Sequence, residues 1–235
     1  MKEKVVVLDF DGVLCNGIDE CLIVSYNSYY GVNIDSKSSL SEDFINFFYK
    51  HRSFVRPPSE FYILYKAFEK DKINLSMESF NCMKKELSTE IKSFEKCFFQ
   101  NRDILRQNPE LWFSFHTIYE EATNFLESYK DRFFILTTKD ENSVKLLSNK
   151  FGFSEKIRDI FSKEISSNKA ILFDTFFSKY GAEFRDKRVI FIDDNEWNLA
   201  DVINFPIDLY FAPWGYSGRQ MVNSFETINE LGEIL

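Results

Sequence analysis

The stretch VVVLDFDGVLCNG, residues 5–17, sets an unbroken apolar run directly before two aspartates and a glycine. An apolar run of this kind is typical of a strand that is buried on both faces, as in a parallel sheet. Side chains alternate along an extended strand, so Asp9 and Asp11 share one side while Phe10 points to the other. Open α/β sheets bind ligands at the carboxyl ends of their strands. We therefore expect both carboxylates at a ligand-binding edge, where Gly12 lets the backbone turn and approach a ligand closely.

Similar apolar runs return later in the chain, separated by segments whose apolar residues recur at helical spacing. Thr117 and Glu120 have the spacing of a capping box at the start of the first of these helices. The alternation predicts an α/β fold with a Rossmann-like parallel sheet. The expected strands are residues 4–9, 132–137, 188–193 and 208–212, and the expected helices are residues 118–130, 141–151, 167–180, 195–204 and 224–234.

The region from residue 18 to residue 114 has a different character, because it contains no strand run. Long stretches such as residues 76–105 carry apolar residues at helical spacing instead. The sequence thus predicts an all-helical domain of residues 18–114, which is large enough to fold as a unit. It interrupts an α/β core of residues 1–17 and 115–235 directly after the first strand.

Polar residues also end the later strands. Thr137 and Thr138 follow one apolar run, where their hydroxyl groups suit a phosphoryl oxygen, and Asp193 and Asp194 end another run. Uncompensated carboxylates repel one another, so the acidic cluster indicates a cation, an unequal distribution of protons, or both. Carboxylate oxygens of this kind suit Mg²⁺. Lys169, at the start of an expected helix, is placed to offset the negative charge and to hold a carboxylate and a phosphate.

The composition restricts the classes of partner. The chain has 29 Lys and Arg against 37 Asp and Glu, a formal net charge of −8, and the charges are scattered. An acidic surface repels phosphate backbones, so no nucleic-acid partner is expected. No apolar run approaches the roughly 18 residues of a membrane span, and the first residues show no cleavage-site pattern, so we expect a cytoplasmic protein without a membrane partner. The four cysteines show no CxxC spacing, which favours reduced thiols over disulfides or structural zinc.

Four segments, in this order, resemble the motifs of the haloacid dehalogenase-like (HAD) superfamily of phosphohydrolases. They are DFDGVLCNG at residues 9–17, FFILTTK at 133–139, SSNKAILFD at 166–174 and VIFIDDNEWNLAD at 189–201. The spacing from Lys169 to Asp194 and the segment APWGYS, residues 212–217, are similar to the phosphoglycolate phosphatase-like branch. An insertion directly after the first motif is where that family places its helical C1 cap. The resemblance does not extend through residues 18–114.

The resemblance implies a Mg²⁺-dependent phosphatase that acts through an aspartyl-phosphate. Asp9 would attack the phosphorus, and Asp11 would protonate the leaving alcohol and then deprotonate the hydrolytic water. The Asp9 carboxylate, the Asp11 backbone carbonyl and Asp194 would hold Mg²⁺. Asp193 would complete the metal shell, bind the ion through water, or instead orient Lys169.

Further contacts to the substrate follow from the same resemblance. Thr137 would bind a phosphoryl oxygen in preference to Thr138, and Phe10 would contribute a backbone N–H group, as would Gly12. Asn198 stands where many relatives carry another carboxylate. Asn16 is a candidate for contact with the substrate or with the interdomain hinge, and the two arginines of the insertion would contact a substrate anion or else lie solvated on the surface. The candidate substrate contacts are Gly12, Asn16, Thr138, Arg52 and Arg56.

The expected substrate is a small phosphorylated metabolite, because a large cap tends to close over the crevice. Dehalogenation is disfavoured, since a halide leaves without a proton and calls for neither Asp11 nor Asp194. A phosphomutase or phosphotransferase on the same core stays open. A catalytically silent binding module also stays open, although its expected mark, the loss of Asp9, Asp11 or the acidic pair, is missing. The sequence names neither the metabolite nor the oligomeric state.

Overall fold

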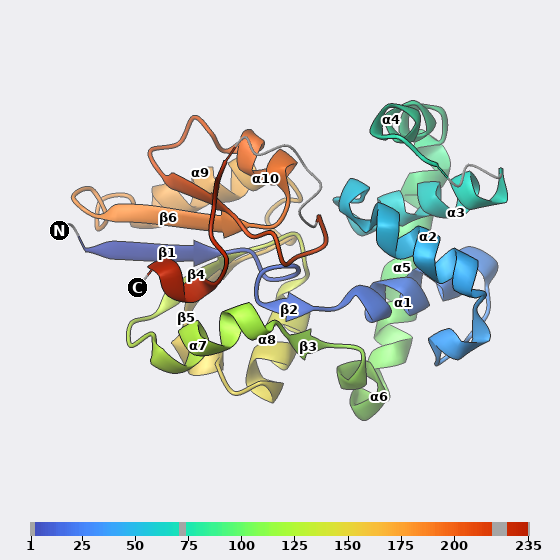
Figure 1. Ribbon diagram of the computed structural model, residues 1–235, viewed down its shortest axis with the longest axis horizontal. Helices are drawn as coiled ribbons and strands as arrows, with labels where there is room; N and C mark the ends of the chain where they lie inside the picture. The colour runs from blue at the N-terminus through green and yellow to red at the C-terminus, as the bar shows by residue number, and fades with distance from the viewer. Residues whose placement is uncertain (1–2, 71–73, 218–224, 235) are drawn as a thin grey trace. The chain divides into compact units, whose positions relative to one another are not determined.

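The computed structural model describes residues 3–70, 74–217 and 225–234. In it the first apolar run forms a central strand of a parallel sheet (Figure 1). The strand order is β5-β4-β1-β6-β7-β8, and the pairs along it are all parallel. This arrangement confirms the predicted α/β fold class. The strands are β1 (Lys4–Leu8), β4 (Phe133–Leu136), β5 (Ile157–Phe161), β6 (Arg188–Asp193), β7 (Asp208–Phe211) and β8 (Glu226–Thr227).

Helices cover both faces of this sheet (Figure 1). Successive side chains of a strand point to opposite faces. Phe133 packs against Phe125 of α7, with ring centroids 5.6 Å apart, whereas Phe134 packs against Phe176 of α9 at 5.1 Å. Burial on both faces explains why the central strands consist of uninterrupted apolar residues. The helices are α7 (Glu120–Ser128) and α8 (Glu141–Lys150) on one face, and α9 (Lys169–Tyr180) and α10 (Glu196–Asp201) on the other.

Two predicted elements are wrong, and strand β5 was not predicted. Thr117 does not cap α7, because it lies in β3 (Thr117–Ile118), which pairs antiparallel with β2 (Cys15–Asn16); the residue before α7, Tyr119, makes no side-chain cap. The expected helix at 224–234 is replaced by β8 and the short 3₁₀ turn Leu231–Ile234, and residue 224 lies outside the described residues.

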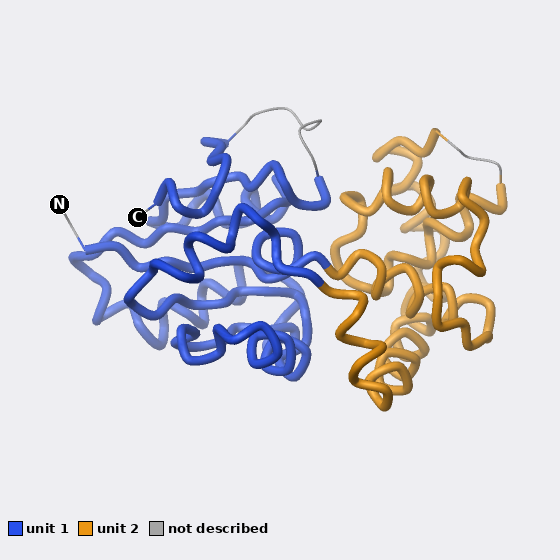
Figure 2. Tube along the Cα trace, turned by 60° about the horizontal axis from the view of Figure 1, so that its bottom comes forward, with its two compact units in different colours: residues 1–16, 117–235 blue, residues 17–116 orange. Residues whose placement is uncertain are grey.

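The chain divides into two compact units, residues 1–16 with 117–235 and residues 17–116 (Figure 2). The second unit is helical, and its described residues contain no strand. Its core stacks Phe61 between Phe48 and Phe98, with ring centroids 5.2 and 5.8 Å apart. The helices are α1 (Ile18–Tyr30), α2 (Glu42–His51), α3 (Phe61–Glu69), α4 (Met77–Glu86), α5 (Ser88–Arg106) and α6 (Pro109–Ser114).

In the part of the chain that the structure describes, none of the helices combines the length and the apolar character needed to cross a lipid bilayer.

Candidate active site

The register of the sheet brings two of the aspartates together. Leu8 of β1 lies opposite Ile192 of β6, so Asp9 and Asp193 occupy the next position on neighbouring strands. The Asp9 N–H donates to the Ile192 carbonyl at 2.9 Å and continues the ladder to the carboxyl end. Both carboxylates are buried at this edge.

Lys169 joins these two carboxylates from the first turn of α9. The Asn168 side chain caps this helix by accepting from the Ala170 N–H at 2.9 Å. The Lys169 ammonium is fully buried and lies 3.0 Å from Asp9 Oδ1 and 3.1 Å from Asp193 Oδ2. It also donates to the Leu136 carbonyl at 2.6 Å, so three partners match the three protons of the ammonium. The lysine therefore ties the ends of β1, β4 and β6 together.

Burial and charge act in opposite directions on this pair. The pKa of Asp9 is raised to about 7, chiefly by burial and also by the charge of Asp193, while the charge of Lys169 acts to lower it. Burial acts to lower the pKa of Lys169, but the charges of Asp193 and Asp9 outweigh it and raise that pKa. A cation bound beside Asp9 would act in the same direction as Lys169 and favour the ionised carboxylate.

Asp193 has no acceptor position to spare. Its Oδ1 accepts from the Asn195 N–H at 2.8 Å, and the Asn198 amide lies 3.1 Å from each of its two oxygens. Lys169 occupies Oδ2 as well. A carboxylate offers about four lone-pair positions, and these contacts fill them. Asp193 thus contacts both the Lys169 ammonium and the Asn198 amide. A role of Asp193 in orienting Lys169 stays a prediction.

Asp194 is held by the loop that follows β7. Its Oδ2 accepts from the Tyr216 N–H at 2.6 Å. A Cβ atom at Gly215 would overlap the Asp194 side chain and the Gly12 carbonyl, and a Cβ at Gly12 would overlap the same carboxylate. Gly12 also has a φ of 88°, a left-handed conformation that favours glycine. Both glycines are therefore required by the close approach of Asp194.

The acidic cluster fits a divalent cation. Asp9, Asp193 and Asp194 each have an oxygen within 4.8 Å of the others, and all three side chains are buried. Asp193 contributes its charge to this cluster, because its acceptor positions are filled. Lys169 pairs with Asp9 and Asp193, and Lys139 pairs with Asp11. Oxygen ligands of this type suit a hard cation.

Asp11 forms an ion pair that the sequence analysis did not anticipate. The Lys139 ammonium lies 3.1 Å from each Asp11 carboxylate oxygen. The Lys139 side chain is 1% exposed and that of Asp11 is 18% exposed, so the pair lies at the boundary with solvent. The available signal was the position of Lys139, which follows Thr137 by two residues and therefore shares its side of an extended chain.

The predicted phosphoryl-binding groups have their own contacts in this structure. Thr137 is buried, and its Oγ1 accepts from the Lys139 N–H at 3.1 Å, whereas Thr138 is partly exposed. The Phe10 N–H donates to Asp9 Oδ1 at 2.7 Å, and the Gly12 N–H donates to the Cys15 carbonyl at 3.0 Å. A phosphoryl contact to these two N–H groups stays a prediction and would have to share donors that are already engaged.

The other expected substrate contacts lie apart from this cluster in the chain. Asn16 is half-buried in β2. Arg52 lies in the helical unit, with its guanidinium 5.2 Å from the centre of the Phe61 ring and Nη1 donating to the Val55 carbonyl at 2.8 Å. The second arginine of this segment is also in the helical unit, and the backbone N–H of Arg56 donates to a Glu60 carboxylate oxygen at 3.0 Å. Both arginines belong to the helical unit, and their contact with a substrate stays a prediction.

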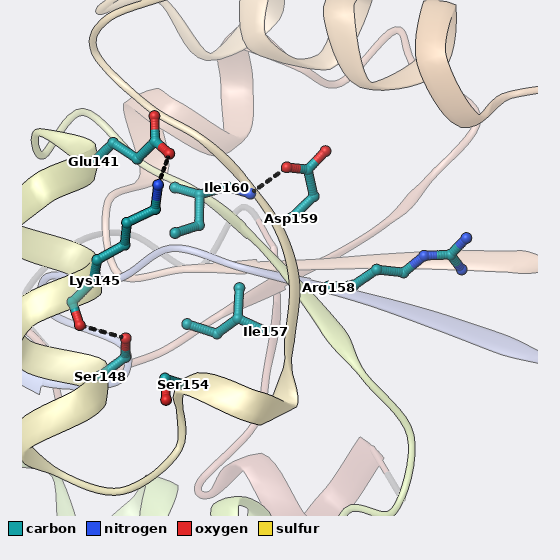
Figure 3. Close-up of a pocket in the computed structure, with 8 residues that line it drawn as sticks. All are labelled: Glu141, Lys145, Ser148, Ser154, Ile157, Arg158, Asp159 and Ile160. Carbon is teal, nitrogen blue, oxygen red and sulfur yellow. Dashed lines mark hydrogen bonds and ion pairs between the residues drawn. The ribbon is translucent and has the colours of Figure 1, made fainter.

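A separate pocket of about 280 Å³ lies between α8 and the edge strand β5 (Figure 3). Lys145 and Glu141 form an ion pair on one side of it, and Asp159 accepts from the Ile160 N–H on the other. None of the six charged groups of the acidic edge lines this pocket. It is therefore a different feature from the candidate active site.

These observations define a doubly covered parallel α/β protein with a carboxylate and lysine centre at the carboxyl edge of its sheet. The protein-family model for haloacid dehalogenase-like hydrolases matches residues 3–200. The chain belongs to this family of hydrolases. No curated protein sequence matches it significantly.

Solved structures share the fold across the whole chain. A Bacteroides fragilis protein, provisionally described as a haloacid dehalogenase-like hydrolase, superposes with a TM-score of 0.69 at 10% identity, covering 100% of each chain. A predicted phosphoglycolate phosphatase from Haemophilus somnus gives 0.65 at 13% identity and covers 100% of this chain and 97% of that one. A protein from Lactobacillus delbrueckii subsp. bulgaricus, provisionally described as a phosphoglycolate phosphatase, gives 0.65 at 12% identity with the same coverage.

Proposed function

We propose that the protein is a Mg²⁺-dependent phosphatase that hydrolyses a small phosphorylated metabolite through an aspartyl-phosphate on Asp9. The observation that carries the proposal is the way Asp9 is held. Its Oδ1 accepts from the Phe10 N–H and pairs with Lys169, and in the described part of the chain no further contact falls on Oδ2. One oxygen thus fixes the carboxylate, and the other serves as the nucleophile.

The remaining residues take roles that match their positions. Asp11 donates a proton to the leaving alcohol and then takes one from the hydrolytic water, which an exposed edge of its side chain allows. Asp9, the Asp11 backbone carbonyl and Asp194 are the proposed ligands of the metal. Mg²⁺ at this position would neutralise charge on the transferring phosphoryl group. Thr137 binds a phosphoryl oxygen through its hydroxyl group.

The helical unit has a proposed role as the cap that selects the substrate. Its support is the insertion point at residue 17, shortly after Asp9 and Asp11, together with the helical composition of residues 17–116. Phosphoglycolate phosphatase is the description that two of the similar structures carry, so small phosphorylated carboxylic acids belong in the first substrate panel.

The test is phosphate release from a panel of phosphorylated metabolites, with Mg²⁺ and with EDTA. Wild type is compared with Asp9→Asn, which keeps the shape of the nucleophile, and with Asp174→Asn, which alters an exposed aspartate of α9. We expect turnover that needs Mg²⁺, is retained in Asp174→Asn and disappears in Asp9→Asn. An acid-quenched, hydroxylamine-sensitive phosphoprotein in wild type would identify the acyl phosphate.

The same assay separates the alternatives. Label that moves from one metabolite to another without release of phosphate would identify a phosphomutase or phosphotransferase. Folded protein that binds Mg²⁺ but turns over nothing and forms no phosphoprotein would identify a silent binding module and refute the proposal.

A further inference from the structure

We infer that Lys139 is a positioning residue that fixes the Asp11 carboxylate for proton transfer to the leaving group. The inference rests on the proposed function, because it assigns a role to a neighbour of the proposed acid and base. It concerns a residue to which neither the motif resemblance nor the metal cluster gives a role.

The contact between Lys139 and Asp11 is symmetric, and its lysine lies in the protein interior. Lys139 Nζ lies 3.1 Å from Asp11 Oδ1 and 3.1 Å from Asp11 Oδ2, so one ammonium holds both oxygens of the carboxylate. The lysine side chain is almost fully buried, whereas Asp11 is partly open to solvent. A buried lysine therefore sets the orientation of the partly exposed Asp11 side chain.

The lysine itself is anchored at both ends of its backbone. Its N–H donates to Thr137 Oγ1 at 3.1 Å, and its carbonyl accepts from the Lys163 N–H at 3.3 Å. The next residue, Asp140, caps α8 by accepting from the Ser143 N–H at 2.9 Å. The turn between β4 and α8 is thus fixed, and it places the ammonium at a defined point.

The other lysine of the site cannot take over this contact. Lys169 has three partners for its three protons, in Asp9, Asp193 and the Leu136 carbonyl. The two lysines therefore contact different carboxylates: Lys169 pairs with the proposed nucleophile Asp9, and Lys139 pairs with Asp11.

The exact position of a carboxyl group matters more when the group transfers a proton than when it acts only through its charge. Proton transfer needs an approach of about 2.6–3.2 Å between the heavy atoms, and correctly placed acid–base groups contribute about 10²–10⁴-fold to rate. Without Lys139, the partly exposed Asp11 side chain is free to turn into solvent. The resulting loss should depend on how strongly the leaving group needs a proton.

The test compares p-nitrophenyl phosphate, whose leaving group departs as a stable anion, with benzyl phosphate, whose leaving group needs a proton. For Lys139→Met we expect kcat for benzyl phosphate to fall by about 10²-fold and kcat for p-nitrophenyl phosphate by less than about threefold. Lys139→Arg should restore part of the benzyl phosphate activity. Lys145→Met, at an exposed lysine of α8, is the matched control and should change neither rate.

A double-mutant cycle that combines Lys139→Met with Asp11→Asn tests whether these two residues act together. The double variant should be no slower on benzyl phosphate than Asp11→Asn alone, since Lys139 acts only through Asp11. Equal losses of Lys139→Met on both substrates, or additive losses in the double variant, would refute the inference while leaving the phosphatase proposal intact.

A readout independent of turnover is the crystal structure of Lys139→Met. Asp11 should leave its wild-type rotamer in that variant, and an unchanged Asp11 conformation would overturn the inference. Absence of phosphate release from wild type would instead count against the proposed function, so the two failures are distinguishable.

Discussion

The substitution Asp193→Asn tests the distinction between the two neighbouring aspartates at the end of β6. Asp193 has its acceptor positions filled by Asn195, Asn198 and Lys169, whereas Asp194 belongs to the same buried cluster and accepts from the Tyr216 N–H. We therefore expect Asp194 to bind the metal directly and Asp193 to orient Lys169. Asp194→Asn is the matched control, because it makes the same chemical change one residue away in another buried side chain.

The size of the effect follows from the contacts. An amide in place of the Asp193 carboxylate must point its NH₂ group either at the Lys169 ammonium or at the Asn195 N–H and the Asn198 amide. Either choice faces a donor with a donor and leaves a buried donor without its acceptor, which costs about 1–3 kcal/mol of unfolding free energy. Lys169 keeps Asp9 and the Leu136 carbonyl as partners, so the variant should still fold.

The assay is Mg²⁺ titration by isothermal calorimetry, with urea unfolding of the metal-free proteins. Both variants remove one negative charge from the cluster, so the difference between them reports direct coordination. We expect Asp194→Asn to bind Mg²⁺ at least about tenfold more weakly than Asp193→Asn, a difference of about 1.4 kcal/mol. At saturating Mg²⁺, Asp193→Asn should still lose kcat. Equal affinities, or weaker binding by Asp193→Asn, would refute the division of roles.

Three further expectations concern the loop at the metal site and the helical unit. Gly215→Ala places a methyl group in the space of a cluster carboxylate and should weaken Mg²⁺ binding by about 10–100-fold in calorimetry, while Gly232→Ala, where the nearest atom lies 3.5 Å away, should leave it unchanged. Arg102→Met removes the guanidinium that lies 2.6 and 2.9 Å from the carboxylate oxygens of the buried Glu20, and it should lower the urea-derived unfolding free energy by about 3–5 kcal/mol. Replacing both residues by apolar ones should recover most of that free energy. A loss below about 1 kcal/mol for the single variant would contradict the argument. Burial lowers the pKa of His51, so the stability that the neutral ring contributes is complete above the unfolded-state pKa of about 6.5 and is lost as pH falls from there through the lower pKa of the folded state. The difference in unfolding free energy between wild type and His51→Gln should therefore shrink from pH 7 to pH 5. A difference that stays constant over this range would contradict the argument.

Burial decides which strands could be predicted. Strand β1 and strand β6 are covered on both faces, so their residues are almost all apolar and the pattern identifies them. Strand β5 lies at the sheet edge, where Arg158 and Asp159 form ion pairs with Glu183 and Lys179, and its half-exposed residues give no apolar run. An edge strand therefore resembles a surface loop in sequence, and it was missed for that reason.

The candidate site could be predicted as far as backbone geometry determines it. Parallel strands end at one edge, so the aspartates that follow β1 and β6 had to lie close together, and Lys169 at the start of α9 had to lie near them. The pairing of Lys139 with Asp11 depends on side-chain rotamers and on the turn before α8, which no spacing rule gives. The contact between Tyr216 and Asp194 depends on β7 running beside β6, which brings a distant loop to the cluster.

The two lysines explain how so many carboxylates are tolerated at one buried edge. An isolated carboxylate in a protein interior costs several kcal/mol, and four of them would repel one another strongly. Lys169 compensates Asp9 and Asp193, and Lys139 compensates Asp11, through contacts of 3.0–3.1 Å. The described contacts of Asp194 include the Tyr216 N–H and the close backbone of Gly12 and Gly215. Asp9, Asp193 and Asp194 each place an oxygen within 4.8 Å of the others, so a divalent cation bound among them would add positive charge where a phosphoryl group would need to be bound.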